Sequence, residues 1–266
     1  MAMRSRIVFQ GAGEACRVEV ADEEGLRVLR FGGGERQSCL DMRYPHRLQL
    51  AYTQWMATAL LLHPDPKRFL VLGLGGGALP HFLLHHHPDA LVDVVEKEAI
   101  ILQVARDFFS LPHSPRLRTF HQDALSYVRD TTEGGYQVAF LDIFGEDGMA
   151  PDLYEERLYA EVLARLSADG ILVVNVWNGD RQLYRKAVEA AGAASDGRLL
   201  CLPVHKRGNE LFFLFAGPIP KSGIRQAIRQ SNVFFERYGI DFAPMLKRLR
   251  RSTQAWPWQR LLLWER

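Results

Sequence analysis

Short apolar runs alternate with amphipathic stretches through the middle of the chain. Runs of strand length occur at residues 69–72, 91–95, 138–141 and 171–176, and a more polar strand is expected near 117–120. Segments with helical periodicity separate them. Strands that alternate with helices of about 10–15 residues are typical of right-handed βαβ units. The pattern therefore predicts an α/β domain built around a parallel sheet.

The two ends of the chain have different patterns. Residues 5–41 alternate polar and apolar positions between glycine-rich turns, which predicts a small antiparallel β unit. A helix is expected over about 47–62, between Pro45 and Pro64. A second helix is expected near 152–166, late antiparallel strands at 199–202 and 211–215, and basic helices over the last 45 residues. The predicted units are a β-strand domain at 1–45, an α/β domain at 46–220 and a basic helical extension at 221–266.

Composition limits the class of protein. With 47% apolar and 24% charged residues among 266, the chain can bury a sizeable core. No run approaches the roughly 18 apolar residues of a membrane span, and the first residues lack the apolar stretch of a secretory signal. The 3 cysteines show no Cys-x-x-Cys spacing, and Cys201 lies in an apolar strand where we expect it in the core. A reducing, cytoplasmic location is expected.

Charge and histidine patterns suggest no further partner. The net charge is +2, but residues 221–266 hold ten Lys and Arg against three Asp and Glu. We interpret this basic stretch, with its three tryptophans, as a solvated helix face rather than a nucleic-acid or membrane surface. His81 and His85 lie one helical turn apart and begin a run through His87, but a catalytic zinc needs about three protein ligands. We therefore expect surface polar residues and no metal.

The most informative segment is a glycine loop between a buried strand and a helix. Residues 69–79 read Phe-Leu-Val-Leu-Gly-Leu-Gly-Gly-Gly-Ala-Leu, so the loop glycines are Gly73, Gly75, Gly76 and Gly77. Glycine permits a tight turn and a close approach of the backbone to a ligand at the helix N-terminus. The same pattern also occurs where a loop serves only as a packing hinge. A nucleotide-type ligand is the interpretation that we favour.

Acidic residues follow the next strands of the predicted sheet. Glu96 ends the strand after the loop, where a carboxylate can accept hydrogen bonds from a ribose diol. Asp123 follows the third strand, where it either accepts from an adenine amino group or caps a helix, and Asp142 closes the fourth. The loop has Ala78 where a dinucleotide fingerprint has its last glycine. These positions favour an S-adenosyl sulfonium ligand over a pyrophosphate.

With these residues in place, the chain resembles the spermidine/spermine synthase (polyamine aminopropyltransferase) family over roughly residues 25–216. The resemblance rests on Gln37, Tyr52, Glu96, Asp123 and Asp142, on the segment 63–68 that leads into the glycine loop, and on 153–159 and 169–172. It implies a Rossmann-like class I S-adenosylmethionine-dependent methyltransferase fold with a small N-terminal antiparallel β domain. It also implies a homodimer, by family resemblance alone.

The resemblance further implies a reaction and a set of site residues. The donor is decarboxylated S-adenosylmethionine, a co-substrate that leaves as methylthioadenosine, and the acceptor is a small amine. Asp142 is implied as the catalytic carboxylate that assists amine deprotonation. Residues implied for the donor are Gln37, Gly73, Gly75, Gly76, Gly77, Glu96, Lys97, Asp123 and Ala124. Residues implied for the acceptor are Tyr52, Gln54, Glu146, Asp147 and Tyr159.

Departures from the family pattern leave the substrates open. Gly76 stands where the family has an Asp that grips the donor's propylamine, Gly145 replaces the second Asp of D-x-x-D, and Thr53-Gln54 replaces a His-Glu pair. Each lost hydrogen bond to a buried ammonium is worth about 1.5–3 kcal/mol. The alternatives are an S-adenosylmethionine-dependent methyltransferase, a non-catalytic nucleoside-binding homologue and, last, a dinucleotide oxidoreductase.

Overall fold

The centre of the structure is a seven-stranded sheet with the order β12-β13-β11-β8-β5-β6-β7. The computed structural model describes residues 5–32, 34, 36–63, 65–145, 148–204 and 208–254. At one edge of the sheet, β13 (Asn209–Phe215) pairs antiparallel with its neighbours β11 and β12 (Leu199–Pro203), so the late strands form antiparallel pairs as predicted. The other strands run parallel: β5 (Arg68–Leu72), β6 (Leu91–Glu96), β7 (Leu117–His121), β8 (Tyr136–Leu141) and β11 (Leu166–Trp177).

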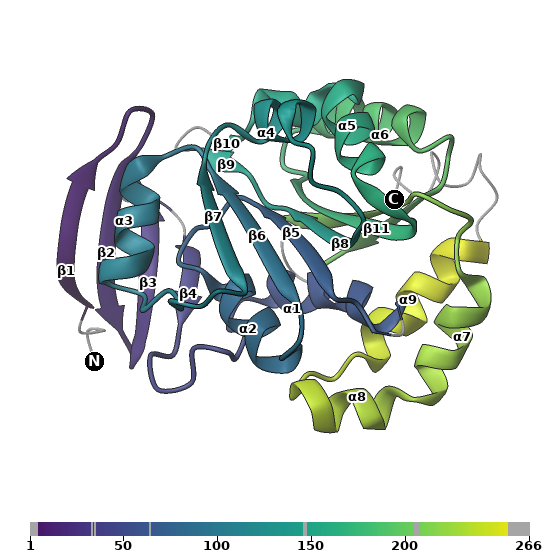
Figure 1. Cartoon of the computed structure of the whole chain (residues 1–266), viewed down its shortest axis with the longest axis horizontal. Coiled ribbons are helices and arrows are strands. Elements are labelled where there is room, and N and C mark those ends of the chain that lie inside the picture. Colours follow the sequence, from purple (N-terminus) through teal and green to yellow (C-terminus); the bar gives the residue numbers. More distant parts are fainter. Residues whose placement is uncertain are drawn as a thin grey trace.

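Alternate residues of the parallel strands face two separate layers of helices. On β5, Phe69 and Val71 belong to one buried cluster, and Leu70 and Leu72 belong to the other. This period of two is what a sheet covered on both faces requires. Helices α2 (Ala78–His86) and α3 (Ala99–Asp107) cover the first face. On the second face lie α4 (Ala124–Asp130), α5 (Glu156–Ala164) and α6 (Arg181–Ala194), which stand together in Figure 1.

The N-terminal residues form a separate antiparallel sheet with α3 beside it (Figure 1). Its strands are β1 (Ser5–Ala12), β2 (Arg17–Glu23), β3 (Leu26–Phe31) and β4 (Arg36–Leu40). The guanidinium of Arg27 donates to the backbone carbonyl of Phe108 at 2.9 Å, and the rings of Phe9 and Phe108 lie 4.9 Å apart. The predicted fold class, α/β with a small N-terminal antiparallel β unit, is confirmed. The domain boundaries stay predictions.

Two predicted helices are each divided in the structure. The helix expected over 47–62 is α1 (Ala51–Met56) followed by a 3-10 helix, η1 (Ala57–Leu61). It begins only at Ala51, because Leu50 is extended, and the backbone carbonyl of Leu48 accepts from the side chain of Gln54 at 2.7 Å. The helix expected over 152–166 is η2 (Pro151–Tyr154) and then α5, because Glu155 is extended between them. β11 follows at Leu166, five residues before the predicted strand.

The basic C-terminal stretch is helical as far as residue 254. Its helices are α7 (Lys221–Arg229), α8 (Ser231–Tyr238) and α9 (Ala243–Gln254). Ser252 of α9 donates to the backbone carbonyl of Cys201 at 2.9 Å, and Cys201 itself is half-buried rather than in the core as expected. No helix in the described part of the chain combines the length and the apolar character needed to cross a membrane. The predicted roles of Trp256, Trp258 and Trp264 fall outside the described residues.

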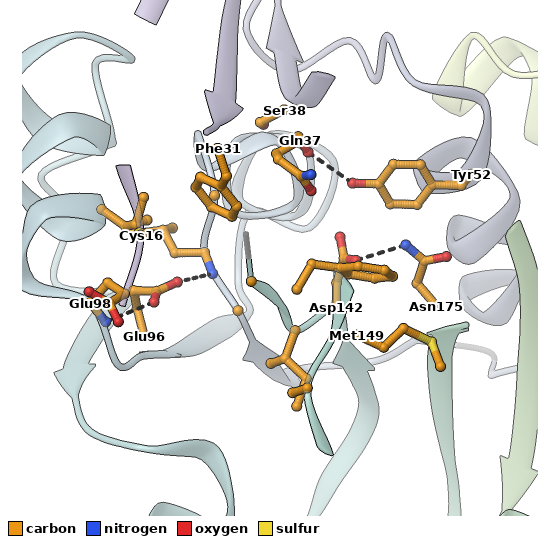
Figure 2. A pocket seen from close by; sticks show the side chains of 18 of the residues that line it. Cys16, Phe31, Gln37, Ser38, Tyr52, Glu96, Glu98, Asp142, Met149 and Asn175 are labelled. Carbon is orange, nitrogen blue, oxygen red and sulfur yellow. Dashed lines mark hydrogen bonds between the residues drawn. The ribbon is translucent and has the colours of Figure 1, made fainter. Parts of the chain in front are cut away.

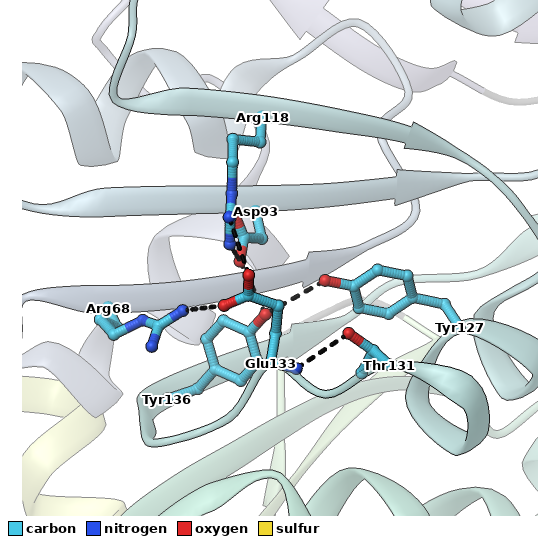
Figure 3. A network of polar contacts seen from close by, with 7 residues as sticks. All are labelled: Arg68, Asp93, Arg118, Tyr127, Thr131, Glu133 and Tyr136. Carbon is cyan, nitrogen blue, oxygen red and sulfur yellow. Dashed lines mark hydrogen bonds and ion pairs between the residues drawn. The ribbon is translucent and has the colours of Figure 1, made fainter.

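A buried carboxylate joins the parallel strands toward their amino ends (Figure 3). Asp93 of β6 is 2% exposed and accepts from Nε and Nη2 of Arg118 on β7, both at 2.6 Å. The hydroxyl of Tyr136 on β8 donates to the same carboxylate at 2.7 Å. Glu133 bridges Arg118 and Arg68 of β5 at 2.9 and 2.6 Å. This network connects four neighbouring strands near their amino ends. Their carboxyl ends are left free for a site.

Candidate active site

A cavity of about 1,040 Å³ lies along the carboxyl edge of the central sheet. Its floor consists of residues that end β5, β6, β8 and β11, and its roof comes from β3, β4 and α1 (Figure 2). The carboxyl ends of parallel strands are where open α/β sheets bind ligands. The cavity therefore lies at the predicted place, between the central sheet and the N-terminal sheet.

The glycine loop takes the tight turn that the sequence predicts. Gly73, Gly75 and Gly77 all have positive φ, of 94°, 53° and 80°. A Cβ atom at Gly73 would collide with the backbone carbonyl of Asp142, so glycine lets β5 and the end of β8 come close. Gly73 and Gly75 line the cavity.

The other two predicted loop glycines serve packing instead. Neither Gly76 nor Gly77 lines the cavity. A Cβ atom at Gly76 would lie 2.9 Å from the hydroxyl of Ser38 on β4, and one at Gly77 would lie 2.9 Å from Leu111. The loop residue that faces the cavity next is Ala78. Two of the loop glycines therefore line the cavity and two pack against neighbouring side chains, and the predicted approach to a ligand stays a prediction.

Glu96 connects the glycine loop to the end of β6. Its Oε2 atom accepts from the backbone N–H of Leu74 at 3.0 Å, and its Oε1 accepts from the backbone N–H of Glu98 at 2.9 Å (Figure 2). Burial raises the pKa of Glu96, while these backbone hydrogen bonds oppose the rise. Lys97 also lines the cavity. The carboxylate is thus fixed at the cavity wall in one orientation.

Asp123 and Ala124 form the wall at the start of α4. Asp123 is the N-cap of α4, because its Oδ1 accepts from the backbone N–H of Ser126 at 2.9 Å. Asp123 is exposed, and it and Ala124 both line the cavity. The two interpretations of Asp123, helix cap and ligand contact, are therefore compatible.

Asp142 lies at the end of β8, in the middle of the cavity floor. Its Oδ1 accepts from the side-chain amide of Asn175 on β11 at 2.9 Å (Figure 2). The amide of Asn209 on β13 in turn donates to Oδ1 of Asn175 at 3.0 Å. Burial raises the pKa of Asp142, and hydrogen bonds from Asn175 and Tyr52 partly oppose this rise. The sheet thus holds a carboxylate whose affinity for a proton is increased.

Tyr52 closes the cavity above Asp142. Its hydroxyl has one proton to donate and two acceptors nearby, the backbone carbonyl of Gln37 at 3.2 Å (Figure 2) and the carboxylate of Asp142. Burial next to Asp142 raises the pKa of Tyr52 well above its ordinary value. Gln37 and Tyr52 both line the cavity, so α1 and β4 meet over the carboxylate.

Two residues predicted for the acceptor lie elsewhere. Tyr159 is fully buried in the core, and its hydroxyl donates to the backbone carbonyl of Leu153 at 2.6 Å. Gln54 does not line the cavity, because its side-chain amide caps the carbonyl of Leu48. The structure therefore corrects both assignments. Glu146 and Asp147 lie outside the described residues.

Sequence reasoning missed the polar and apolar groups around Asp142. Asn175 and Asn209 line the cavity, as do Trp177, Met149 and Phe144. The sequence does contain an indication of Asn175, since it is a polar residue inside the apolar run 171–176. It contains none of Asn209, because only the pairing of β13 with β11 brings that residue to this edge.

Histidines of the run 85–87 pack against aromatic rings. His46 and His85 stack with ring centroids 3.8 Å apart, and His81 lies buried with Nε2 3.0 Å from the carbonyl of Phe109. His87 is also buried, which differs from the expected surface position. Over the described part of the chain, no three His, Cys, Asp or Glu side chains gather in a way that could hold a metal ion.

Known proteins resemble this chain in sequence and in fold. The family profile described as spermine/spermidine synthase domain matches residues 50–189. The polyamine aminopropyltransferase of Chromobacterium violaceum is 30% identical over 239 residues, which cover 89% of this chain and 90% of that protein.

Two solved structures share the fold. A probable spermidine synthase from Corynebacterium glutamicum superposes with a TM-score of 0.69 at 17% identity, covering 83% of this chain and 86% of that one. Human methyltransferase-like protein 13, solved in complex with SAH, superposes with a TM-score of 0.61 at 22% identity, covering 78% and 96%.

Proposed function

Because the chain belongs to the spermine/spermidine synthase family, we propose that it transfers an aminopropyl group from decarboxylated S-adenosylmethionine to a small amine. The observation that carries the proposal is Asp142, a carboxylate fixed in the middle of a cavity that extends to both sides of it. The family is one of transferases, and the second product of this reaction is methylthioadenosine. By family resemblance we also propose a homodimer.

The half of the cavity over β5, β6 and β7 suits the donor. Glu96 uses one lone pair of each oxygen on backbone N–H groups and keeps others for the hydroxyls of a ribose. Asp123 and Ala124 form the wall next to it, where an adenine would lie. Gly73 and Gly75 let the backbone approach the sulfonium arm from below, and Gln37 covers it from above.

The half of the cavity beyond Asp142 suits the acceptor. Asn175 and Asn209 supply polar groups there, and Trp177 and Met149 supply an aromatic and a thioether surface. Tyr52 belongs to the roof of the cavity, above Asp142 in the floor (Figure 2). An amine that enters this half meets the carboxylate before it meets the donor.

The reaction needs a carboxylate in this position. The amine nitrogen attacks the carbon next to the sulfonium, the carbon–sulfur bond breaks, and its electron pair stays on sulfur as a neutral thioether. The acceptor enters as an ammonium ion, and the proton that it must lose to free the attacking lone pair passes to the Asp142 carboxylate. Because burial raises the pKa of Asp142, its affinity for that proton is greater than that of an exposed aspartate. Alignment of nitrogen, carbon and sulfur supplies much of the remaining rate.

A second candidate function is methyl transfer from S-adenosylmethionine itself. The observation that favours it is Gly76, which stands where the family has the Asp that grips the donor's propylamine, so the loop brings no carboxylate to the donor's arm. The donor's own carboxylate could then lie near the backbone N–H groups of the loop. The similarity in fold to human methyltransferase-like protein 13 is consistent with this alternative.

Mass spectrometry of the products distinguishes these functions. The purified protein is incubated with each donor in turn and a mixture of diamines and polyamines. A product heavier by an aminopropyl group supports the proposal, and one heavier by a methyl group supports the alternative. Asp142→Asn should lower turnover by about 100- to 10,000-fold. It should still be stabilised against heat by the donor, because the donor half of the cavity is intact.

Two controls complete the experiment. Asp107→Asn changes an exposed aspartate of α3 outside the cavity and should leave turnover unchanged. Donor-induced stabilisation without any product in the wild type would indicate a nucleoside-binding protein that is not an enzyme. Stabilisation by NAD(H) alone would indicate a dinucleotide enzyme and refute the proposal.

A further inference from the structure

Two asparagines from distant parts of the chain form a hydrogen-bonded row that ends on Asp142. Asn209 is the first residue of β13, and because β13 runs antiparallel to β11, it pairs with Trp177 at the cavity edge. Its amide donates to Oδ1 of Asn175 at 3.0 Å, and the amide of Asn175 donates to Oδ1 of Asp142 at 2.9 Å. Asn175 is 2% exposed, so its amide depends on these two side chains for its hydrogen bonds.

The order of donors and acceptors in this row follows from amide chemistry. A primary amide has one accepting end and one donating end. An ionised carboxylate only accepts, so Asn175 must turn its NH₂ group toward Asp142. If Asn175 were reversed, its NH₂ group would face the NH₂ group of Asn209 and its oxygen would face the carboxylate. The donated hydrogen bond from Asn209 therefore disfavours the reversed orientation.

We infer that Asn209 is a positioning residue for the transfer reaction. Through Asn175 it keeps Oδ1 of Asp142 hydrogen-bonded and leaves Oδ2 to take the proton of the acceptor amine. The inference rests on the proposed function and adds to it, because it assigns a role to a residue that the family resemblance does not include. Asn209 acts only through Asn175, so the two residues should not contribute independently.

The same row sets the pH at which Asp142 is ionised. A hydrogen bond donated to a carboxylate favours its charged form, so losing that bond raises the pKa of the carboxyl. Tyr52 of α1 is the titratable side chain that interacts with Asp142. The other charged residues that line the described part of the cavity are Arg30, Arg36, Glu96, Lys97, Glu98, Asp123 and Asp152. None of these is changed by substituting an asparagine of the row.

Three variants test the inference through the pH dependence of kcat/KM. Asn209→Ala should move the acid limb of the profile to higher pH by up to about one unit, the shift expected when the Asn175 hydrogen bond to the charged carboxylate is lost in full. Asn175→Ala should move it at least as far. The double variant should match Asn175→Ala alone, because Asn209 then has nothing left to orient.

A measurement without turnover separates this inference from the proposed function. Carbon-13 NMR of labelled aspartate side chains, with Asp142→Asn to assign the signal, gives the pKa of Asp142 in the ligand-free protein. The same upward shift in Asn209→Ala is expected there, even if the transfer assay finds no product. Asn209→Val, a β-branched residue that suits a strand, replaces Asn209→Ala if that variant does not fold.

The matched control is Asn232→Ala, at an exposed position of α8. It should leave both the kinetic profile and the NMR titration unchanged. The inference is overturned if Asn209→Ala lowers activity while the pKa of Asp142 stays where it was, since that is the behaviour of a merely structural residue. Additive shifts in the double variant would overturn it as well.

Discussion

Replacing Asp93 by asparagine should destabilise the protein far more than its distance from the cavity suggests. The substitution keeps the shape of the side chain and removes its charge. Asp93 accepts hydrogen bonds from two nitrogens of Arg118 and from the hydroxyl of Tyr136, at 2.6 to 2.7 Å. An asparagine offers one accepting oxygen and places an NH₂ group against a neighbouring donor.

The size of the loss in unfolding free energy depends on how far the partners of Asp93 are exposed to solvent. Each hydrogen bond to a buried charge contributes about 1.5–3 kcal/mol, and breaking a buried ion pair costs about 3–5 kcal/mol. The side chain of Arg118 is 42% exposed and keeps Glu133 as a partner, which reduces the cost of leaving it. We therefore expect the free energy of unfolding to fall by about 3 kcal/mol.

Equilibrium unfolding in urea measures this loss. The matched control is Asp130→Asn, whose carboxylate pairs with Arg129 at 2.6 Å but has a side chain 53% exposed. Solvent screens an exposed ion pair, so the control should change little despite an equally short contact. A loss below about 1 kcal/mol in Asp93→Asn, or equal losses in both variants, would refute the argument that burial decides the cost.

Three further outcomes are expected. Glu96→Gln should weaken donor binding by about tenfold or more, seen as a smaller donor-induced rise in melting temperature, because one backbone N–H bond and the ribose acceptor are impaired. Gly73→Ala should lower the melting temperature, because its φ of 94° and the adjacent carbonyl of Asp142 both exclude a Cβ atom. Burial raises the pKa of Glu210 from 4.5 to about 8, so between these values the unfolded chain releases a proton that the folded protein retains. Stability should fall over that pH range, and urea unfolding of Glu210→Gln should not show this fall.

Much of the architecture could be predicted from the sequence because short apolar runs, polar–apolar alternation and glycine turns are local signals. Glu96, Asp123 and Asp142 were found for the same reason, since each directly follows a recognisable strand. Tyr159 was misplaced because a resemblance aligns positions and does not tell which side of α5 faces the core.

The parts of the site that escaped prediction depend on long-range pairing. Asn175 and Asn209 are 34 residues apart and meet only through the register of β11 with β13. A slip of one residue in that register would turn Asn209 to the other face of the sheet. Periodicity along the chain does not contain this information.

The roof of the cavity comes from a different sheet than its floor. Ser38 packs over the glycine loop, and the backbone carbonyl of Gln37 accepts from the hydroxyl of Tyr52. The position of the N-terminal strands therefore sets the distance between the roof and the floor of the cavity. A bound nucleoside would touch both sheets at once and resist their separation. The residence time of such a ligand would then depend on how tightly the two layers are docked, and substitutions at the Arg27–Phe108 contact could shorten it without touching any reacting atom.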